Sequence, residues 1–418
     1  MIKKVKHILR SQASQQSLVT ALTNLISAGL MGIAFIVLGR LMGPSNFGIF
    51  SVNISLMLIF NQVISGGINQ LMPRFIGHWY QFPKKQQAFL QHLLYWQMIL
   101  AVLLVAGSLI LLPVLSRIFN YPYPTMLLIA LAGAVFFALY NYLYYYYLAK
   151  QRFLQAGLMN VSQAVFKLIA LALIIIIWQG NLLAISSAYY LALLAVPLIF
   201  LLLDKQLRLH RPQALSRQKA EKINRLWRHA WIATLSIVLV DNFDLLLVQR
   251  FSNDYQAGLY AGAMKIAMFM NLIGLSIEAV INSRVARYNN KQTLREFLKK
   301  SHILILLSIV LSIIVIPLSE LLIKYSLGSD YLAAVGVLQL LLINVFLTIN
   351  VLPLAGIFYA IDKPNYFSRV GLIRVLIIFG LSVWLLPQFG VQAAAASRIV
   401  ATVVVLIYSW VVVKKELK

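Results

Sequence analysis

The stretch Gly39–Val52, GRLMGPSNFGIFSV, recurs in related form as Gln249–Ala263, QRFSNDYQAGLYAGA, half the chain length away. Aligned at an offset of 210 residues, the two stretches match at three positions, and the same register continues without a gap to two more. The matched pairs are Arg40 and Arg250, Gly48 and Gly258, Phe50 and Tyr260, Asn61 and Asn271, and Arg74 and Arg284. Five matches in one register indicate an internal repeat.

The composition is that of a membrane protein. Of 418 residues, 61% are hydrophobic and only 11% are charged, whereas a soluble domain has about a quarter charged residues. We therefore predict an all-α integral membrane protein. Twelve apolar segments are each near the roughly 20 residues that a transmembrane helix needs: 17–39, 46–70, 89–112, 123–148, 154–178, 182–203, 228–249, 256–282, 302–324, 331–359, 366–387 and 391–413.

Positive charge alternates between successive loops. Most of the 36 lysines and arginines lie in one set of loops and at the two chain ends, whereas the other set holds four: Arg40, Arg117, Arg250 and Lys324. Cytoplasmic loops collect lysine and arginine, so both termini are predicted to be cytoplasmic. Much of the net charge of +25 is then explained by the lysines and arginines of cytoplasmic loops, and no nucleic-acid partner is expected.

A basic polar segment, residues 205–228, divides the chain into residues 1–204 and 229–418. Each part holds six predicted spans, and an even number makes both enter the membrane from the same side. The sequence therefore predicts two six-helix bundles forming a parallel repeat around a central cavity, with the linker in the cytoplasm. We assign the repeated Arg40, Gly48, Arg74, Arg250, Gly258 and Arg284 to the repeat and its gates, with the two glycines allowing close helix approach.

The first half contains no acid that could pair with its buried cation. Residues 1–203 have neither Asp nor Glu, yet Lys167 lies near the middle of the fifth span, too deep for easy snorkelling to the interface. Two interpretations stay open. Lys167 faces a wet cavity or an anionic ligand, or it pairs with backbone carbonyls or with the second half.

The second half carries charge of both signs within its spans. The stretch Ser236–Arg250, SIVLVDNFDLLLVQR, includes Asp241 and Asp244, and a carboxylate at the bilayer centre costs about 2.5–3.5 kcal/mol. Counted from the following turn, Asp244 and Lys265 have similar depth, so we predict that they pair. Either the pair is structural, or it serves substrate or ion coupling with Asp241 as the proton-exchanging carboxylate. Further intramembrane candidates are Glu278 for coupling, and Arg398, Arg374 and Asn271 for the cavity.

A run of tyrosines ends the fourth predicted span. The run Tyr140–Phe153, YNYLYYYYLAKQRF, places four consecutive tyrosines around a helix, which predicts an interfacial aromatic belt and leaves sugar stacking as an alternative.

No GxxxxGK[ST] phosphate loop and no HExxH motif occurs, and without cysteine there are no thiolate metal ligands. We therefore expect neither an enzyme nor a cofactor.

The stretches RLMGPSNFGIFSV and DNFDLLLVQRFSNDYQAGLYAGAMKIA resemble the polysaccharide transporter branch of the multidrug/oligosaccharidyl-lipid/polysaccharide (MOP) exporter superfamily. Chain length and span number fit along the whole sequence. The resemblance implies a flippase that moves undecaprenyl-diphosphate-linked oligosaccharide, an O-antigen, capsule or exopolysaccharide repeat unit, across the bacterial cytoplasmic (inner) membrane. Lys167, Lys265 and Arg398 would hold the diphosphate or acidic sugars. Membrane lipid, a polysaccharide polymerase and a chain-length regulator are the implied partners.

Two other functions compete with this one. The first is a cation-coupled multidrug exporter of the same superfamily, which often has a carboxylate in the first half, where this chain has none. The second is a non-transporting membrane scaffold of a glycan-assembly complex, which would not need a buried Lys167.

Overall fold

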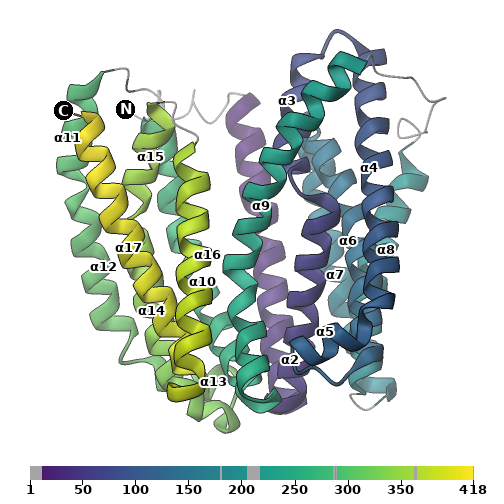
Figure 1. Ribbon diagram of the computed structural model, residues 1–418, viewed down its shortest axis with the longest axis vertical. Helices are drawn as coiled ribbons and strands as arrows, with labels where there is room; N and C mark the ends of the chain where they lie inside the picture. The colour runs from purple at the N-terminus through teal and green to yellow at the C-terminus, as the bar shows by residue number, and fades with distance from the viewer. Residues whose placement is uncertain are drawn as a thin grey trace. The chain divides into compact units, whose positions relative to one another are not determined.

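The computed structural model describes residues 12–178, 181–204, 217–285, 288, 290–361 and 365–417, and these residues are almost entirely helical (Figure 1). The all-α fold predicted from the sequence is confirmed. In chain order the elements are α2 (Gln12–Ser65), α3 (Ile68–His78), α4 (Pro83–Ile110), α5 (Leu112–Ile118), α6 (Pro124–Ala149), α7 (Phe153–Trp178), α8 (Leu182–Leu203), α9 (Arg217–Phe251), α10 (Asp254–Val285), α11 (Lys291–Lys300), α12 (His302–Val315), α13 (Ser319–Ser326), the 3₁₀ helix η2 (Ser329–Ala334), α14 (Val335–Ile349), α15 (Leu352–Ala360), α16 (Asn365–Phe389) and α17 (Gln392–Leu417).

Eleven helical stretches in the described part of the chain are long and apolar enough to cross a membrane, whereas twelve spans were predicted. The difference lies in α2, which has 54 residues and is interrupted at Gly43, where φ is 68°. A straight helix of that length would measure about 80 Å, against a hydrocarbon core of about 30 Å. The two segments of α2 are therefore the first two predicted spans, joined by a kink that glycine permits and Pro44 follows.

The predicted polar linker is partly helical. Residues 205–216 lie outside the described residues, but from Arg217 onward the chain is already part of α9, which continues without a break to Phe251. The cationic start of α9 and its membrane-spanning part therefore form one element of 35 residues.

The chain divides into two compact units, and each is described by itself. Unit 1 comprises Met1–Ala34, Leu56–Arg117 and Pro122–Leu235, and unit 2 comprises Phe35–Ser55, Ile118–Tyr121 and Ser236–Lys418. The middle of α2 thus belongs to unit 2, although the division predicted from the repeat places it in the first half. Helix α9 also contributes to both units.

Unit 1 packs α3, α6, α7 and α8 around a core rich in aromatic side chains. The start of α9 is fixed to the turn between α2 and α3 by two indole hydrogen bonds. Trp227 Nε1 donates to the Gly66 carbonyl at 2.6 Å, and Trp231 Nε1 donates to the Val63 carbonyl at 2.9 Å. A Cβ on Gly66 would overlap the Trp231 ring, so this contact requires glycine.

The tyrosine run at the end of α6 belongs mainly to this core. Tyr140, Tyr142, Tyr146 and Tyr147 are all less than 9% exposed. Of the four consecutive tyrosines, Tyr146 and Tyr147 are thus buried in the protein and the predicted interfacial belt is wrong for them, whereas Tyr144 and Tyr145 are half-buried. Because the other helices of unit 1 surround this end of α6, side chains that point in different directions all find packing partners.

Unit 2 contains a reciprocal contact between the two copies of the repeat. A Cβ on Gly48 would overlap the carbonyl oxygen of Asp254, and a Cβ on Gly258 would overlap the carbonyl oxygen of Pro44. Gly48 and Gly258 are equivalent in the repeat, and so are Pro44 and Asp254, because each pair is 210 residues apart. The two contacts are therefore the same contact made in both directions. The predicted close approach at Gly48 and Gly258 is confirmed, and the two glycines make it with each other's segments.

Helix α12 ends earlier than predicted, and an unexpected helix precedes it. The predicted span 302–324 is broken around Pro317 into α12 and α13, since proline removes a backbone donor and clashes with the preceding turn. The loop predicted before this span contains α11, whose N-cap Asn290 accepts a hydrogen bond from the Thr293 amide at 3.0 Å. Only Leu294 of α11 is buried, so α11 is an amphipathic surface helix.

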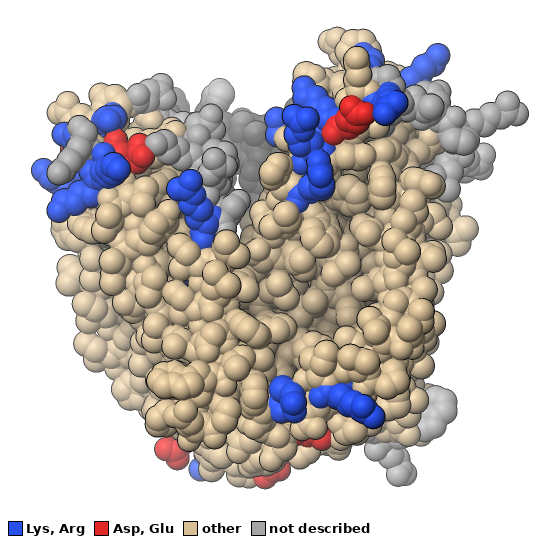
Figure 2. Space-filling model, viewed as in Figure 1, with Lys and Arg blue, Asp and Glu red and all other residues tan. Residues whose placement is uncertain are grey.

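Cations gather at one end of each unit, as Figure 2 shows for the face it presents. In unit 1 they lie over the end formed by α3, the start of α4 and the start of α9. In unit 2 they lie over α11 and the adjoining last turn of α17, which contains Lys414 and Lys415. These ends carry the loops that the charge pattern predicts to be cytoplasmic.

Candidate functional site

Asp244 lies at the centre of a buried polar cluster in unit 2. Its side chain has no exposed surface. One carboxylate oxygen accepts from the Leu245 amide at 2.9 Å, and the other accepts from the Tyr260 hydroxyl and from Arg398 Nε. These donors come from α9, α10 and α17, so a single carboxylate joins three helices. A buried charge is tolerable when it is paired and hydrogen-bonded in this way.

Arg398 uses its remaining donors on the backbone of α9. Its Nη2 donates to the carbonyl oxygens of Val240 and Asp241, both at 3.1 Å. Its side chain is 13% exposed. Arg398 is therefore a partner of Asp244 and a fixed part of the helix packing, with little of its guanidinium open to a ligand.

The predicted pair of Asp244 with Lys265 is wrong. Lys265 instead lies over the Phe35 ring, with Nζ 4.1 Å from the ring centroid. Helix α9 ends at Phe251 and α10 begins at Asp254, so the residue at the depth of Asp244 is close to Tyr260. Lys265 is about one helical turn deeper. The prediction counts both helices from Asp254, the first residue of α10, which makes Asp244 too deep and level with Lys265.

Asp241 is the exposed member of the cluster. Its carboxylate interacts electrostatically with Arg398, Asp244 and Arg374. Arg374 of α16 also approaches Thr402 Oγ1 at 3.5 Å, and that hydroxyl donates to Asn344 Oδ1 at 2.7 Å. Unit 2 thus presents an accessible carboxylate beside a half-buried arginine, which is the pair of groups best placed here to exchange a proton or meet an ion.

Lys167 is the buried cation of unit 1. Its side chain on α7 is 5% exposed, Nζ lies 3.3 Å from the Tyr189 hydroxyl, and it lies 4.3 Å from the centroid of the same ring. Both residues lie on the packed pair α7 and α8. The interpretations left open by the sequence were a wet cavity, an anionic ligand, backbone carbonyls and the second half, and none of them included a neutral tyrosine of the same half. A role for Lys167 in substrate binding stays a prediction.

Amide side chains form a second polar cluster in unit 1, between α2, α4 and α6. Asn61 Oδ1 accepts from Asn141 Nδ2 at 2.9 Å, and Asn61 Nδ2 donates to the Ala134 carbonyl at 3.2 Å. Gln97 Nε2 donates to Ser65 Oγ at 3.1 Å on the adjoining turn of α2. Sequence reasoning noticed Asn61 only as a repeat match. The sequence does contain a signal for this cluster, because its four amide or hydroxyl side chains lie in otherwise apolar spans. They are Asn61, Ser65, Gln97 and Asn141.

The remaining predicted residues lie apart from these clusters. Asn271 is exposed on α10 and Glu278 is half-buried near its end, and neither makes a hydrogen bond or ion pair with another described residue. Arg40 donates to the Tyr325 carbonyl, and Arg250 lies over the Phe251 ring. Arg74 and Arg284, which match in the repeat, each line a hollow at the cationic end of their own unit.

The fold is that of transporters of the MOP superfamily. An inward-facing multidrug resistance MATE family transporter is 16% identical with a TM-score of 0.74, covering 94% of this chain and 98% of that one. The lipid II flippase MurJ is 14% identical with a TM-score of 0.77, covering 95% and 87%. A MOP superfamily transporter from Pyrococcus furiosus is 14% identical with a TM-score of 0.57, covering 98% and 97%.

The sequence itself matches the family described as polysaccharide biosynthesis protein over residues 13–277. The chain belongs to this family, and the resemblance found in the sequence is confirmed. No match is found among curated proteins. The protein is therefore a multi-pass membrane protein of polysaccharide biosynthesis with a MOP transporter fold.

Proposed function

We propose that this chain is a flippase that moves a lipid-linked oligosaccharide across the bacterial cytoplasmic membrane, exposing the glycan head to one side and then to the other. The observation that carries the proposal is membership of a polysaccharide biosynthesis family by a chain with the fold of membrane transporters. The substrate proposed is an undecaprenyl-diphosphate-linked repeat unit of O-antigen, capsule or exopolysaccharide.

The charges within the membrane-spanning helices support an anionic substrate. Lys167, Lys265, Arg374 and Arg398 lie in candidate spans that contain few acids. Ionisable groups at such depth are costly and mark substrate or ion pathways. Lys265, Arg374 and Arg398 are half-buried, but Arg398 is already paired with Asp244. Lys265 and Arg374 are therefore the cations that a diphosphate could reach most readily, whereas Lys167 and Arg398 would act after a rearrangement or at a distance.

Asp241 is the proposed coupling group. It is exposed on α9 beside Arg374 and Arg398, and a carboxylate in that position can gain or lose a proton without breaking the buried Asp244–Arg398 pair. The drug-exporter alternative shares this fold. It would use the same carboxylate to receive a cation, so substrate selectivity separates the two functions.

Reconstitution tests the proposal directly. Purified protein is placed in proteoliposomes with a polyprenyl-diphosphate oligosaccharide that carries a fluorophore on the glycan, and a membrane-impermeant quencher reports how much glycan reaches the outer leaflet. We expect quenching beyond the half of the label that is initially outside, and only with active protein. Transport of cationic dyes together with no movement of the glycan would instead identify a drug exporter, and movement of neither would favour the scaffold.

A deletion strain gives the matching cellular result. Cells that lack the protein should accumulate the lipid-linked repeat unit on the cytoplasmic side and lose surface glycan. A polysaccharide polymerase and a chain-length regulator are the proposed partners downstream, since they would consume the translocated unit.

A further inference from the structure

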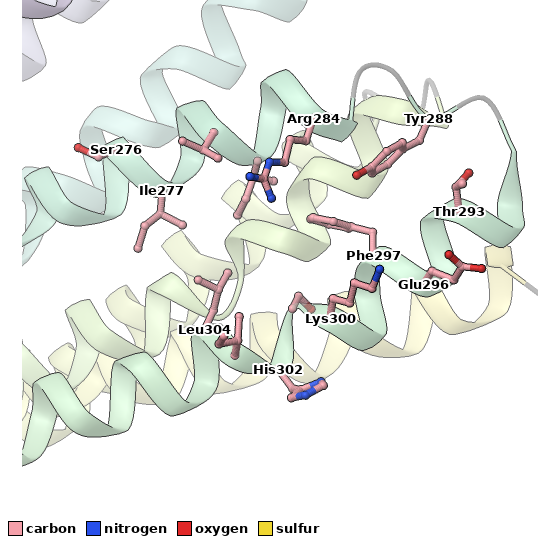
Figure 3. A pocket seen from close by; sticks show the side chains of 14 residues that line it. Ser276, Ile277, Arg284, Tyr288, Thr293, Glu296, Phe297, Lys300, His302 and Leu304 are labelled. Atoms are coloured by element: carbon pink, nitrogen blue, oxygen red, sulfur yellow. The ribbon is translucent and has the colours of Figure 1, made fainter. Parts of the chain in front are cut away.

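Unit 2 contains a groove of about 890 Å³ that none of the predicted site residues except Arg284 lines. The groove is formed by the last turns of α10, by α11 and by the start of α12 (Figure 3). The candidate span in α10 is Asp254–Glu278, and the next candidate span, Lys291–Val315, begins with the cationic helix α11. The groove therefore lies at the polar ends of the apolar parts of α10 and α12, where we place the membrane border.

The wall of the groove is apolar toward the membrane. Ile277 and Val280 line it from α10, and Ile303 and Leu304 line it from α12. Val280 is 51% exposed and Ile303 is 65% exposed. Helix α12 continues outward from the groove with a surface of exposed Ile, Leu and Val side chains, which is what a helix in contact with lipid tails presents.

Two cations project into the polar end of the groove. Arg284 projects from α10 into the space between the helices, and Lys300 extends from the last turn of α11 (Figure 3). Both are exposed, and neither makes an ion pair or a side-chain hydrogen bond with another described residue. Glu296 and Thr293 lie at the outer rim. The net charge of Arg284, Lys300 and Glu296 together is therefore +1.

This arrangement fits an amphiphile that has one negative charge at the membrane border. We propose that the groove binds an anionic glycerophospholipid of the same leaflet, with its phosphodiester on Arg284 and Lys300 and an acyl chain along Val280 and Ile303. Cationic amphipathic helices attract anionic lipids, and α11 has this character with three lysines and one arginine in ten residues flanking Glu296. The single positive charge matches a phosphodiester better than the two or more negative charges of a diphosphate. The bound lipid would join α10 to α11, and the inference does not depend on the proposed transport activity.

Native mass spectrometry of the delipidated protein in detergent tests the site. Phosphatidylglycerol is added and compared with zwitterionic phosphatidylcholine and with undecaprenyl diphosphate. We expect a phosphatidylglycerol adduct on the unmodified chain that weakens by at least about tenfold in Arg284→Gln/Lys300→Gln, because both charge-assisted contacts with the phosphodiester are lost. Lys291→Gln/Lys299→Gln is the matched control, since it removes two exposed charges from the same helix outside the groove.

A second variant keeps the charges and fills the apolar part. Val280→Trp places a large side chain on an exposed position of α10, and it should also abolish the adduct while the protein stays monodisperse. Equal loss in the Lys291/Lys299 control, equal binding of phosphatidylcholine, or retention of phosphatidylglycerol by both groove variants would overturn the proposal. Preference for undecaprenyl diphosphate over phosphatidylglycerol would overturn the assigned occupant.

Discussion

Asp244 on α9 and Arg398 on α17 form an ion pair that is 0% and 13% exposed, 154 residues apart in the chain. The pair explains how an aspartate is accommodated in an apolar span, because its charge is balanced and both of its oxygens are hydrogen-bonded. It also fixes α17 against α9 at a level deep in the helical part of unit 2. Its disruption should therefore affect folding before it affects transport.

Asp244→Ala should destabilise the protein strongly. It leaves Arg398 buried without a counter-charge, and breaking a buried pair in this way costs about 3–5 kcal/mol. Thermal unfolding of detergent-purified protein measures the effect. The matched control is Glu320→Gln, which removes an exposed acid and should change stability by less than about 0.5 kcal/mol.

A double-mutant cycle identifies the partner of Asp244. Asp244→Asn combined with Arg398→Met should show coupling of about 0.5–3 kcal/mol, as residues in one salt-bridge network do. Asp244→Asn combined with Lys265→Met should be additive within about 0.5 kcal/mol, since Lys265 packs on Phe35 instead. Strong coupling to Lys265 and none to Arg398 would contradict the geometry described for the cluster.

Gly48→Ala and Gly258→Ala should each destabilise the protein by at least about 2 kcal/mol, within or above the usual range for overpacking. The added methyl groups meet backbone carbonyls, which cannot move aside as a side chain can. Gly274→Ala is the control on α10, because a Cβ there meets nothing within 4 Å. Since alanine favours helix over glycine by about 1 kcal/mol, this variant should be as stable as the parent or more so. Unfolding temperatures of the three variants compare them, and tolerated alanines at both contact glycines would refute the close approach.

Asp241→Asn should leave the fold intact and lower proton-dependent transport. The side chain is exposed and makes no hydrogen bond with another described residue, so stability should change by less than about 0.5 kcal/mol. The quencher assay in proteoliposomes with and without a pH gradient measures transport. A variant that responds to the gradient as the parent does would remove Asp241 from any coupling role.

Lys167 can be tested against its tyrosine partner. Lys167→Met should reduce surface glycan while the protein remains in the membrane, and Lys167→Arg should retain part of the activity because it keeps the charge. Tyr189→Phe keeps the ring under the ammonium and removes only one hydrogen bond, which contributes about 0.5–1.5 kcal/mol, so its effect should be smaller. Glycan staining of whole cells and immunoblots of membranes provide the two readouts. Full surface glycan with Lys167→Met would exclude a role for the charge.

The periodic and apolar features of the sequence predicted the fold well, whereas side-chain partners were predicted poorly. The spans 366–387 and 391–413 correspond closely to α16 and α17, because runs of about 20 apolar residues have few alternatives. The Asp244 partner was misassigned, because depth along a helix says nothing about direction around it and Arg398 is remote in sequence. Proline at 317 and the cap at Asn290 altered local boundaries that hydropathy alone does not resolve.

The reciprocal contact of Gly48 and Gly258 has a consequence for how such a chain arose. A contact in which each segment offers the same surface to the other is isologous, the form that two-fold symmetric dimers use. A single half encoded alone would carry both surfaces needed to make this contact with another copy of itself. Gene duplication and fusion would then convert a homodimer interface into an internal one, after which each copy was free to acquire its own charges, such as Lys167 in one and Asp241 in the other.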